Sequence, residues 1–289
     1  MTEWLERYFM YDLKDKVVLI SGASGGIGKA IAQEALRRGA KVSVCARNLE
    51  KLTAAYPMRE NIFLVQADVS NEADCARWIQ ETYTKWGRVD VLINNAGQSM
   101  RALFEYADLS VLKQLMDVNF WGAVYCTKYA LPFIKESKGV IAGVSSIAGY
   151  RGLPGRTGYS ASKFALQGFL EALRTELLHT GVHVMWVSPG FTASNIRNTA
   201  LAADGKAQKE TPLDESKLMS AEACARLLLD ALQKRKRSLV MTGQGKLTVW
   251  MNKLFPGLAD KLVYQHFLKE PESPLVGYGS GSQVDKLRS

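Results

Sequence analysis

The chain has 289 residues, of which 47% are hydrophobic and 22% are charged, as in an ordinary globular protein, so a disordered or fibrous chain is excluded. The net charge is +9, and six of the nine excess positive charges lie from residue 234 onward. The nearly balanced main body argues against a nucleic-acid-binding protein, whose folded part usually carries a basic face.

Cysteine and histidine usage also narrows the class of protein. The four cysteines lie far apart without a CxxC pair, and only three histidines are present, so we expect neither a disulfide framework nor a metal site. Free thiols are typical of a reducing compartment. The first residues lack the apolar core of a secretory signal, and no apolar stretch is long enough to span a membrane. We therefore expect a cytoplasmic protein.

Strands and helices are predicted to alternate along most of the chain. Apolar runs predict strands at 16–20, 41–46, 61–68, 89–97, 139–146, 183–190 and 238–242. Helical patterns lie between them at 29–38, 72–86, 111–137, 158–179 and 220–236. The runs lack polar alternation, so both faces of the sheet are covered, and the regular alternation predicts right-handed crossovers. This pattern predicts one α/β domain with a doubly wound, Rossmann-type parallel sheet.

Four segments are set apart from this pattern. Residues 1–13 form a short amphipathic segment before the α/β domain at 14–243. Within that domain 191–219 breaks the alternation and follows a strand end, where ligands bind in such sheets, so it is predicted to be a substrate lid. Residues 276–289 are predicted to be a flexible tail. In the extension 244–275, apolar residues recur at helical spacing between lysines, which fits contact with an anionic membrane surface, the substrate mouth or a second subunit. Those residues are Leu247, Trp250, Met251, Leu254, Phe255 and Leu258, with Lys246 and Lys253.

A glycine-rich turn joins the first strand to the first helix. Gly22, Gly26 and Gly28 leave room for a pyrophosphate to approach the backbone, and the helix N-terminus attracts its charge. Their spacing is GxxxGxG rather than GxGxxG, and a purely structural turn is the alternative. We expect this turn to bind a dinucleotide through Gly22, Ser24, Gly26, Ile27 and Gly28.

The end of the second strand bears on the choice of nucleotide. An acidic residue there would bind the ribose 2′-hydroxyl of NAD, but the chain has Arg47, whose guanidinium suits the 2′-phosphate of NADP. A solvated loop arginine is the alternative. Asp68 ends the third strand, next to Val69, and is expected to accept a hydrogen bond from adenine. Asn95, Ala96 and Gly97 end the fourth strand.

Four polar residues in order along the chain predict acid–base chemistry. Tyr159 and Lys163 are one helical turn apart, so an ammonium group would lower the high pKa of the phenol. Ser146 ends the fifth strand, and Asn119 lies in the preceding helix. Each has an ordinary explanation alone, as an exposed helix face or a helix cap. Their joint occurrence at strand ends points to a site.

Together, SGASGGIG at 21–28, NNAG at 94–97, Asn119, Ser146, Tyr159-x-x-x-Lys163 and PG at 189–190 resemble the short-chain dehydrogenase/reductase family over residues 14–243. The stretches SPGFTASNIRNTAL and SAEACARLLLDAL resemble its 11β-hydroxysteroid and retinoid dehydrogenase-like branch. The resemblance implies a seven-stranded parallel sheet in the order 3-2-1-4-5-6-7 and assembly into a homodimer or homotetramer.

The resemblance also implies residue roles. Tyr159 is the general acid/base, Ser146 orients the carbonyl, Lys163 holds the nicotinamide ribose and lowers the tyrosine pKa, and Asn119 anchors a water in a proton relay. Pro189, Gly190 and Thr192 would border the nicotinamide. Two departures are Ser21, where threonine is common, and Gly25, where many NADP-dependent members carry a basic residue. Ser145 competes with Ser146 for the catalytic place, and the thirteen-residue interval to Tyr159 favours Ser146.

We therefore expect NADP(H)-dependent interconversion of a hydrophobic ketone or aldehyde and its alcohol, on a steroid, retinoid or long-chain keto-lipid. The alternative is an inactive NADP(H)-binding sensor. Substrate-facing residues are expected in loops 98–103, 147–157 and 191–211, and they include Met100, Arg101, Tyr150, Arg151, Leu153, Arg156 and Phe191.

Overall fold

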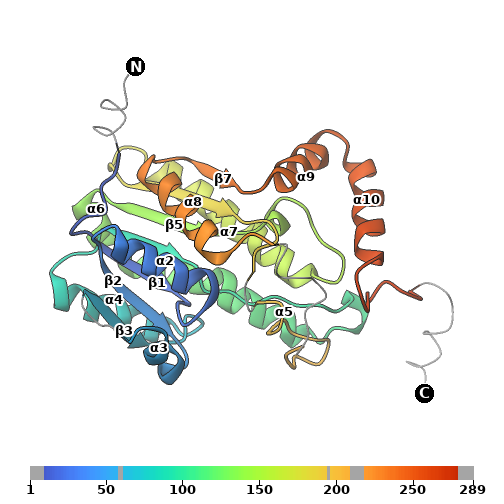
Figure 1. Ribbon diagram of the computed structural model, residues 1–289, viewed down its shortest axis with the longest axis horizontal. Helices are drawn as coiled ribbons and strands as arrows, with labels where there is room; N and C mark the ends of the chain where they lie inside the picture. The colour runs from blue at the N-terminus through green and yellow to red at the C-terminus, as the bar shows by residue number, and fades with distance from the viewer. Residues whose placement is uncertain (1–9, 58–60, 194–195, 209–217, 279–289) are drawn as a thin grey trace.

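The computed structural model describes residues 10–57, 61–193, 196–208 and 218–278. A parallel sheet runs through its centre (Figure 1). Its strands are β1 (Val17–Ser21), β2 (Lys41–Ala46), β3 (Ile62–Gln66), β4 (Val91–Asn94), β5 (Val140–Val144), β6 (His183–Ser188) and β7 (Ser238–Val240). They lie in the order β3-β2-β1-β4-β5-β6-β7, which confirms the expected seven-stranded Rossmann-type fold.

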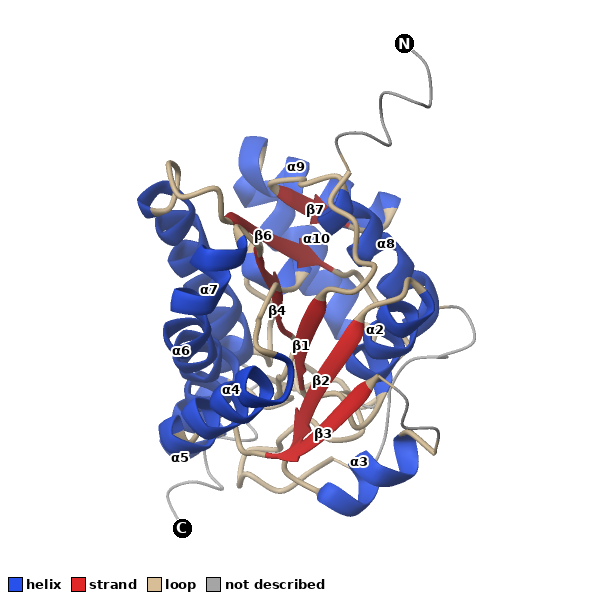
Figure 2. Cartoon of the chain, turned by 90° about the vertical axis from the view of Figure 1, so that its left-hand side faces the viewer, coloured by secondary structure: helices blue, strands red, loops and turns tan. Residues whose placement is uncertain are grey.

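Helices cover both faces of this sheet (Figure 2). One face carries α2 (Gly26–Arg37), α3 (Leu49–Ala55) and α8 (Ala221–Gln233). The other carries α4 (Glu72–Trp86), α5 (Leu109–Met116), α6 (Gly122–Ser137) and α7 (Thr157–Glu176). This two-sided cover explains why the strands are apolar throughout.

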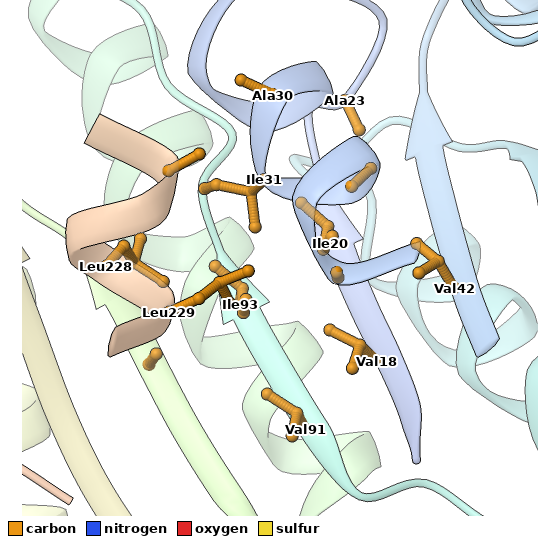
Figure 3. Close-up of a cluster of buried hydrophobic side chains, with 14 of the residues drawn as sticks. Val18, Ile20, Ala23, Ala30, Ile31, Val42, Val91, Ile93, Leu228 and Leu229 are labelled. Atoms are coloured by element: carbon orange, nitrogen blue, oxygen red, sulfur yellow. The ribbon is translucent and has the colours of Figure 1, made fainter. Parts of the chain in front are cut away.

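The core consists of two layers, one on each face of the sheet. On one face, Val18 and Ile20 of β1 pack with Ile31 of α2 and with Leu228 and Leu229 of α8 (Figure 3). Val17 and Leu19 point the other way, toward α4, α6 and α7. Successive strand residues face opposite sides, so one unbroken apolar run fills both layers.

The sheet reverses its strand order beside β1. β1 pairs with β2 on one side and with β4 on the other, so the chain runs outward through β2 and β3 and then crosses back past β1 to form β4. In an open parallel sheet, a crevice forms beyond the carboxyl ends of the strands at this switch point. The residues after β1, β2, β3, β4, β5 and β6 therefore meet there.

The helices differ from the expected pattern most clearly in the following places. The predicted helix 29–38 begins at Gly26, so part of the glycine-rich turn is helical. The short helix α3 was not expected, and Asn48 starts it by accepting a hydrogen bond from the Lys51 amide at 2.7 Å. The predicted helix 111–137 begins at Leu109 and contains a π-helical segment, Asp117–Trp121, between α5 and α6.

The C-terminal extension forms two further helices at one side of the molecule (Figure 1). These are α9 (Gly243–Leu254) and α10 (Pro256–Leu268), which pack against each other. Most of the predicted N-terminal amphipathic segment and of the predicted flexible tail lies outside the described residues. Within the described ranges, no helix is long and apolar enough to cross a membrane.

Candidate active site

A cavity of about 510 Å³ opens at the carboxyl ends of the strands. Its wall contains every residue that the sequence predicted for cofactor binding. These are Gly22, Ser24, Gly26, Ile27, Gly28, Arg47, Asp68, Val69, Asn95, Ala96, Gly97, Tyr159, Lys163, Pro189, Gly190 and Thr192. Ser146 also lines this cavity. The structure thus brings together residues from six strand ends.

Two glycines of the turn after β1 are required by packing. A Cβ on Gly28 would lie 2.4 Å from both the Gly22 carbonyl oxygen and the Asn95 Nδ2 atom. Gly22 has a φ of +67°, and a Cβ there would lie 2.7 Å from the Ala96 Cα atom. Gly25, in contrast, has no heavy atom within 4 Å of an added Cβ. The turn is therefore packed tightly against the segment after β4 and open toward the cavity at Gly25.

Asn95 and Ser21 fasten this turn to the end of β4. The Asn95 amide donates hydrogen bonds to the carbonyl oxygens of Ser21 at 2.9 Å and Gly22 at 3.2 Å. In return, the Ser21 hydroxyl oxygen accepts from the backbone amides of Asn95 and Ala96, each at 3.0 Å. Asn95 therefore positions the glycine-rich turn, and the serine at position 21 supplies the hydroxyl for the same purpose.

On the β2–β3 side, the cavity wall consists of polar and positively charged side chains rather than glycines. Arg47 is exposed at the rim, and Asn48 and Lys51 line the wall beside it. Asp68 accepts hydrogen bonds from the Ser70 amide at 3.0 Å and the Ser70 hydroxyl at 2.7 Å. Lys51 was not predicted, although its place four residues after Arg47 was a usable signal.

Lys163 is buried beneath the opposite part of the cavity. Its ammonium group donates a hydrogen bond of 2.9 Å to the carbonyl oxygen of Val144. Burial lowers the pKa of Lys163 to about 8. A Cβ on Gly97 would lie 3.4 Å from this nitrogen and 3.2 Å from the Asn119 Oδ1 atom, so the glycine leaves space for both polar groups.

Tyr159 is half-buried in the cavity wall, one turn before Lys163. Burial raises the pKa of Tyr159, whereas a hydrogen bond with Ser146 and the charges of Arg156 and Arg197 lower it. The Lys163 nitrogen lies 5.7 Å from the centre of the tyrosine ring. Burial therefore has the largest effect on the Tyr159 pKa, and the expected lowering of this pKa by Lys163 together with a bound nicotinamide stays a prediction.

The two serines after β5 have different surroundings, although both line the cavity. Ser145 is buried and accepts a hydrogen bond of 2.7 Å from the Gln167 side chain. Ser146 bonds Tyr159, and its hydroxyl oxygen also accepts from the Ala148 amide at 3.1 Å. Of the two, Ser146 is therefore the one that is coupled to the phenol.

Asn119 lies behind the cavity wall, in the π-helical segment. Its amide nitrogen donates to the Gln98 carbonyl oxygen at 2.9 Å and to the Ser162 hydroxyl at 2.8 Å. Its carbonyl oxygen accepts from the Gln98 amide at 2.7 Å. The residue thus joins the segment after β4 to α7.

The other end of the cavity is lined by apolar side chains and two arginines. These residues are Leu153, Arg156, Phe191, Ile196, Arg197 and Thr199. Three of them, Leu153, Arg156 and Phe191, were predicted from the loops. The cavity wall at this end therefore offers both apolar surface and positive charge.

Four other loop residues that were expected to face substrate lie elsewhere. Met100 is fully buried in a small core cluster. The Tyr150 hydroxyl accepts a hydrogen bond of 2.8 Å from Trp186, and Arg101 pairs with Glu270. Arg151 turns toward the C-terminal helices, where it bonds Asn252 at 2.9 Å and Asp260 at 2.5 Å. Tertiary packing places all four away from the cavity.

A buried charge cluster lies beside this end of the cavity. Arg156 contacts both carboxylate oxygens of Glu270, at 3.3 and 3.4 Å, and its guanidinium lies 4.6 Å from the centre of the Phe267 ring. Arg101 shares the same carboxylate at 3.8 Å. Glu270 follows α10, and its role had no sequence signal, because its partners are 114 and 169 residues away. The C-terminal extension is thus joined to the cavity wall.

Comparison with known families agrees with this geometry. Residues 16–205 match the family model described as short chain dehydrogenase. This chain belongs to the short-chain dehydrogenase/reductase family. It is accordingly an oxidoreductase, and the resemblance inferred from the sequence is confirmed.

Relatives of this short-chain dehydrogenase/reductase also agree with the expected branch. It is 36% identical to 11-beta-hydroxysteroid dehydrogenase-like 4A of Arabidopsis thaliana, over 84% of this chain and 82% of the relative. It is 33% identical to dehydrogenase/reductase SDR family member 7B of Mus musculus, over 90% and 84%.

Solved structures share the fold. A short-chain dehydrogenase from Burkholderia cenocepacia J2315, in complex with NADP, superposes with a TM-score of 0.75 at 24% identity, covering 88% of this chain and 99% of that one. One from Burkholderia phymatum, in complex with NAD, gives 0.73 at 22% identity, covering 86% and 96%.

Proposed function

We propose that this short-chain dehydrogenase/reductase uses NADP(H) to interconvert a hydrophobic ketone or aldehyde with its alcohol, and that it acts mainly as a reductase. One observation carries the proposal. Tyr159 and Ser146 line the same cavity as the glycine-rich turn and Arg47. One cavity therefore combines a proton donor with groups suited to a dinucleotide.

The glycine-rich turn fits the pyrophosphate of such a cofactor. The space beside Gly25 is open, Gly26 has a φ of +52°, and the turn leads into the N-terminus of the twelve-residue helix α2, which favours a bound anion. Asp68, Val69, Asn95, Ala96 and Gly97 would border the adenosine and ribose groups, and Pro189, Gly190 and Thr192 the nicotinamide. When bound, NADPH supplies the hydride.

Two cations support the choice of NADP over NAD. Arg47 and Lys51 adjoin the cavity after β2, where a carboxylate would be needed to bind a free ribose 2′-hydroxyl. Similar folds are seen with NADP and with NAD, so the fold alone does not select the nucleotide. The positive charge of Arg47 and Lys51 is what supports the choice of NADP.

The proton step is assigned to Tyr159. In the reductive direction its hydroxyl protonates the substrate oxygen while Ser146 donates a hydrogen bond to the same oxygen. The phenolate that remains is stabilised by Arg156, Arg197 and Lys163. Asn119 holds Gln98 and Ser162 in place behind the cavity, a position from which it would anchor a water for returning the proton.

The substrate end supports a sizeable apolar compound. Leu153, Phe191 and Ile196 offer apolar surface in the wall, and segment 191–219 is proposed as the lid over it. We propose a steroid, retinoid or long-chain keto-lipid as the substrate class, and the relatives named 11-beta-hydroxysteroid dehydrogenase favour the steroid among these. Part of the proposed lid, at 194–195 and 209–217, lies outside the described residues.

Assembly and compartment are proposed on separate evidence. Trp121 and Phe164 are exposed at 44% and 47% on the α6–α7 side, and the Trp121 ring lies beside those of Phe120 and Tyr125, which supports a homodimer through this face. An assembly of four identical subunits would give the homotetramer that is the alternative. All four cysteines are buried and free, which supports a reducing compartment such as the cytoplasm.

The test is NADPH oxidation with a panel of hydrophobic ketones and aldehydes. We expect turnover by the wild type and a loss of about 10²-fold or more in Tyr159→Phe, with NADPH affinity retained. Ser146→Ala should lose less, and Ser145→Ala should serve as its neighbour control. NADPH binding without turnover of any carbonyl compound would instead support the inactive sensor.

A further inference from the structure

The C-terminal helices α9 and α10 expose an unusually apolar surface, here called the α9–α10 face. It is made of side chains that are each 37% to 57% exposed. They are Leu247, Trp250, Leu254, Phe255, Leu258, Leu262, Tyr264 and Leu268. In soluble proteins, exposed large apolar residues usually occur one at a time. A group of them on one surface marks a site that binds a protein partner or a membrane.

The two helices that carry this face are held in place by contacts with the rest of the chain. Asn252 donates to the Tyr150 carbonyl oxygen at 3.0 Å, and Arg151 bonds both Asn252 and Asp260. Phe267 and Ala259 are the buried residues of α10. The helices therefore belong to the folded body, and Figure 1 shows them standing out at its edge.

Lysines surround the apolar side chains. Lys246 and Lys253 lie on α9, Lys261 lies on α10, and Lys269 follows it, and all four are exposed. Asp260 is the acidic residue within these two helices, and it is engaged by Arg151 at 2.5 Å. The surface therefore combines exposed apolar groups with cations whose charge is not balanced locally.

From this combination we infer that the α9–α10 face docks on an anionic lipid bilayer. Leu247, Trp250 and Leu254 recur at i, i+3 and i+7 on one face of α9, as expected for a helix lying in the interface. Tryptophan and tyrosine suit the headgroup level, and the lysine side chains reach anionic headgroups from beside the apolar groups.

A second copy of the chain fits this face less well. In a two-fold contact each surface meets itself, so the lysines of the two copies would face one another. Asp260 is already paired with Arg151, so it offers little compensation across such a contact. The aromatic side chains on the α6–α7 side present a surface for self-association without this like-charge cluster.

The face also adjoins the substrate end of the cavity. The ring of Phe191, which lines the cavity, stacks at 6.2 Å with that of His266 on α10. Phe267, next along α10, packs on Arg156 of the cavity wall. A protein docked through α9 and α10 would hold this end of the cavity close to the bilayer.

The experiment is co-sedimentation of the full chain with vesicles, without cofactor or substrate. We expect binding to vesicles of phosphatidylcholine mixed with phosphatidylserine, weaker binding to phosphatidylcholine alone, and weakening by salt. The double variant Trp250→Ser/Leu258→Ser should bind at least about tenfold more weakly, as should Lys253→Glu/Lys261→Glu.

Matched variants control for exposed apolar area and for charge. Leu178→Ser/Leu227→Ser removes two leucines that are 67% and 43% exposed elsewhere, and Lys234→Glu/Lys236→Glu changes the charge equally after α8. Both should bind like the wild type. Circular dichroism on heating shows whether each variant is folded.

A second measurement locates the contact. Brominated acyl chains should quench tryptophan fluorescence of the wild type on anionic vesicles, and most of this quenching should disappear in Trp250→Phe. Failure of the wild type to bind anionic vesicles, or equal loss in the matched variants, would overturn the inference. So would vesicle-free self-association that depends on Trp250 and Leu258, because a second copy would then cover the face. Binding is measured without turnover, so this result is independent of the proposed reaction.

Discussion

The ammonium group of Lys163 and the carbonyl oxygen of Val144 are joined by a hydrogen bond of 2.9 Å. This bond ties α7 to the end of β5 at the base of the cavity. The carbonyl oxygen is a neutral acceptor, so it does not neutralise the buried positive charge. Burial accordingly lowers the pKa of Lys163 to about 8. Keeping Lys163 protonated in this buried position therefore lowers the free energy of unfolding.

This arrangement predicts a pH dependence of stability. Lys163 has its usual pKa of 10.5 in the unfolded chain and about 8 in the folded one, so between these values the unfolded chain binds the extra proton. The contribution of Lys163 to the free energy of unfolding should rise with pH across that window, by on the order of 1 to 3 kcal/mol. Urea unfolding of wild type and Lys163→Met at about pH 7 and about pH 10 measures it. Equal pH slopes in the two proteins would contradict the prediction.

Arg47 provides a test of nucleotide choice. Arg47→Asp should weaken NADPH binding by about tenfold or more and reverse the preference toward NADH, because a carboxylate repels the 2′-phosphate and accepts from a free 2′-hydroxyl. Titration calorimetry with both nucleotides measures the ratio. Arg226→Asp, an exposed position on α8, changes the net charge equally and should leave the ratio unchanged. Equal wild-type affinities for the two nucleotides would refute the role given to Arg47.

The glycine-rich turn offers a matched pair of substitutions. Gly28→Ala places a methyl group 2.4 Å from the Gly22 oxygen and the Asn95 nitrogen, so it should destabilise the protein by about 1 to 3 kcal/mol and weaken NADPH binding. Gly25→Ala meets nothing within 4 Å and has an extended φ of −176°, so stability should be nearly unchanged. Thermal unfolding compares them, and equal losses would show that packing does not explain Gly28.

Glu270 tests the link between the C-terminal extension and the cavity. Glu270→Gln leaves Arg156 and Arg101 without their shared anion and should destabilise the protein by about 3 kcal/mol. It should also raise the KM for the carbonyl substrate while leaving NADPH affinity unchanged, since the cluster lies at the substrate end. Glu272→Gln is the exposed control. Wild-type stability and KM in Glu270→Gln would show that the charge cluster does not contribute to the substrate site.

The fold and the cofactor end were predictable because their signals are local. Uniformly apolar strands, the glycine-rich turn and polar residues directly after strands each occupy short stretches of sequence. The sheet topology then brings these stretches to one edge without further information. The Tyr159 and Lys163 pair was predictable for the same reason, since one helical turn separates the two residues.

The substrate end was less predictable because its contacts join distant segments. Met100 and Arg151 lie in the correct loops, yet packing directs one into a core cluster and the other toward Asp260. The effect of burial on Tyr159, and of Arg156 and Arg197 on its pKa, depends on tertiary neighbours. The seven-residue helix α3 shows only a brief sequence pattern, which begins with its cap at Asn48.

The charge cluster of Arg101, Arg156 and Glu270 has a consequence for local opening. The cofactor end is assembled from strand ends rooted in the two core layers, whereas the substrate end depends on one carboxylate carried by helices with little buried surface. Regions of few buried contacts exchange their amide hydrogens through small openings rather than global unfolding. Amides around α10 should therefore exchange sooner than those of β1 and β4, leaving one half of the cleft preformed while the other half adjusts to the shape of each new ligand.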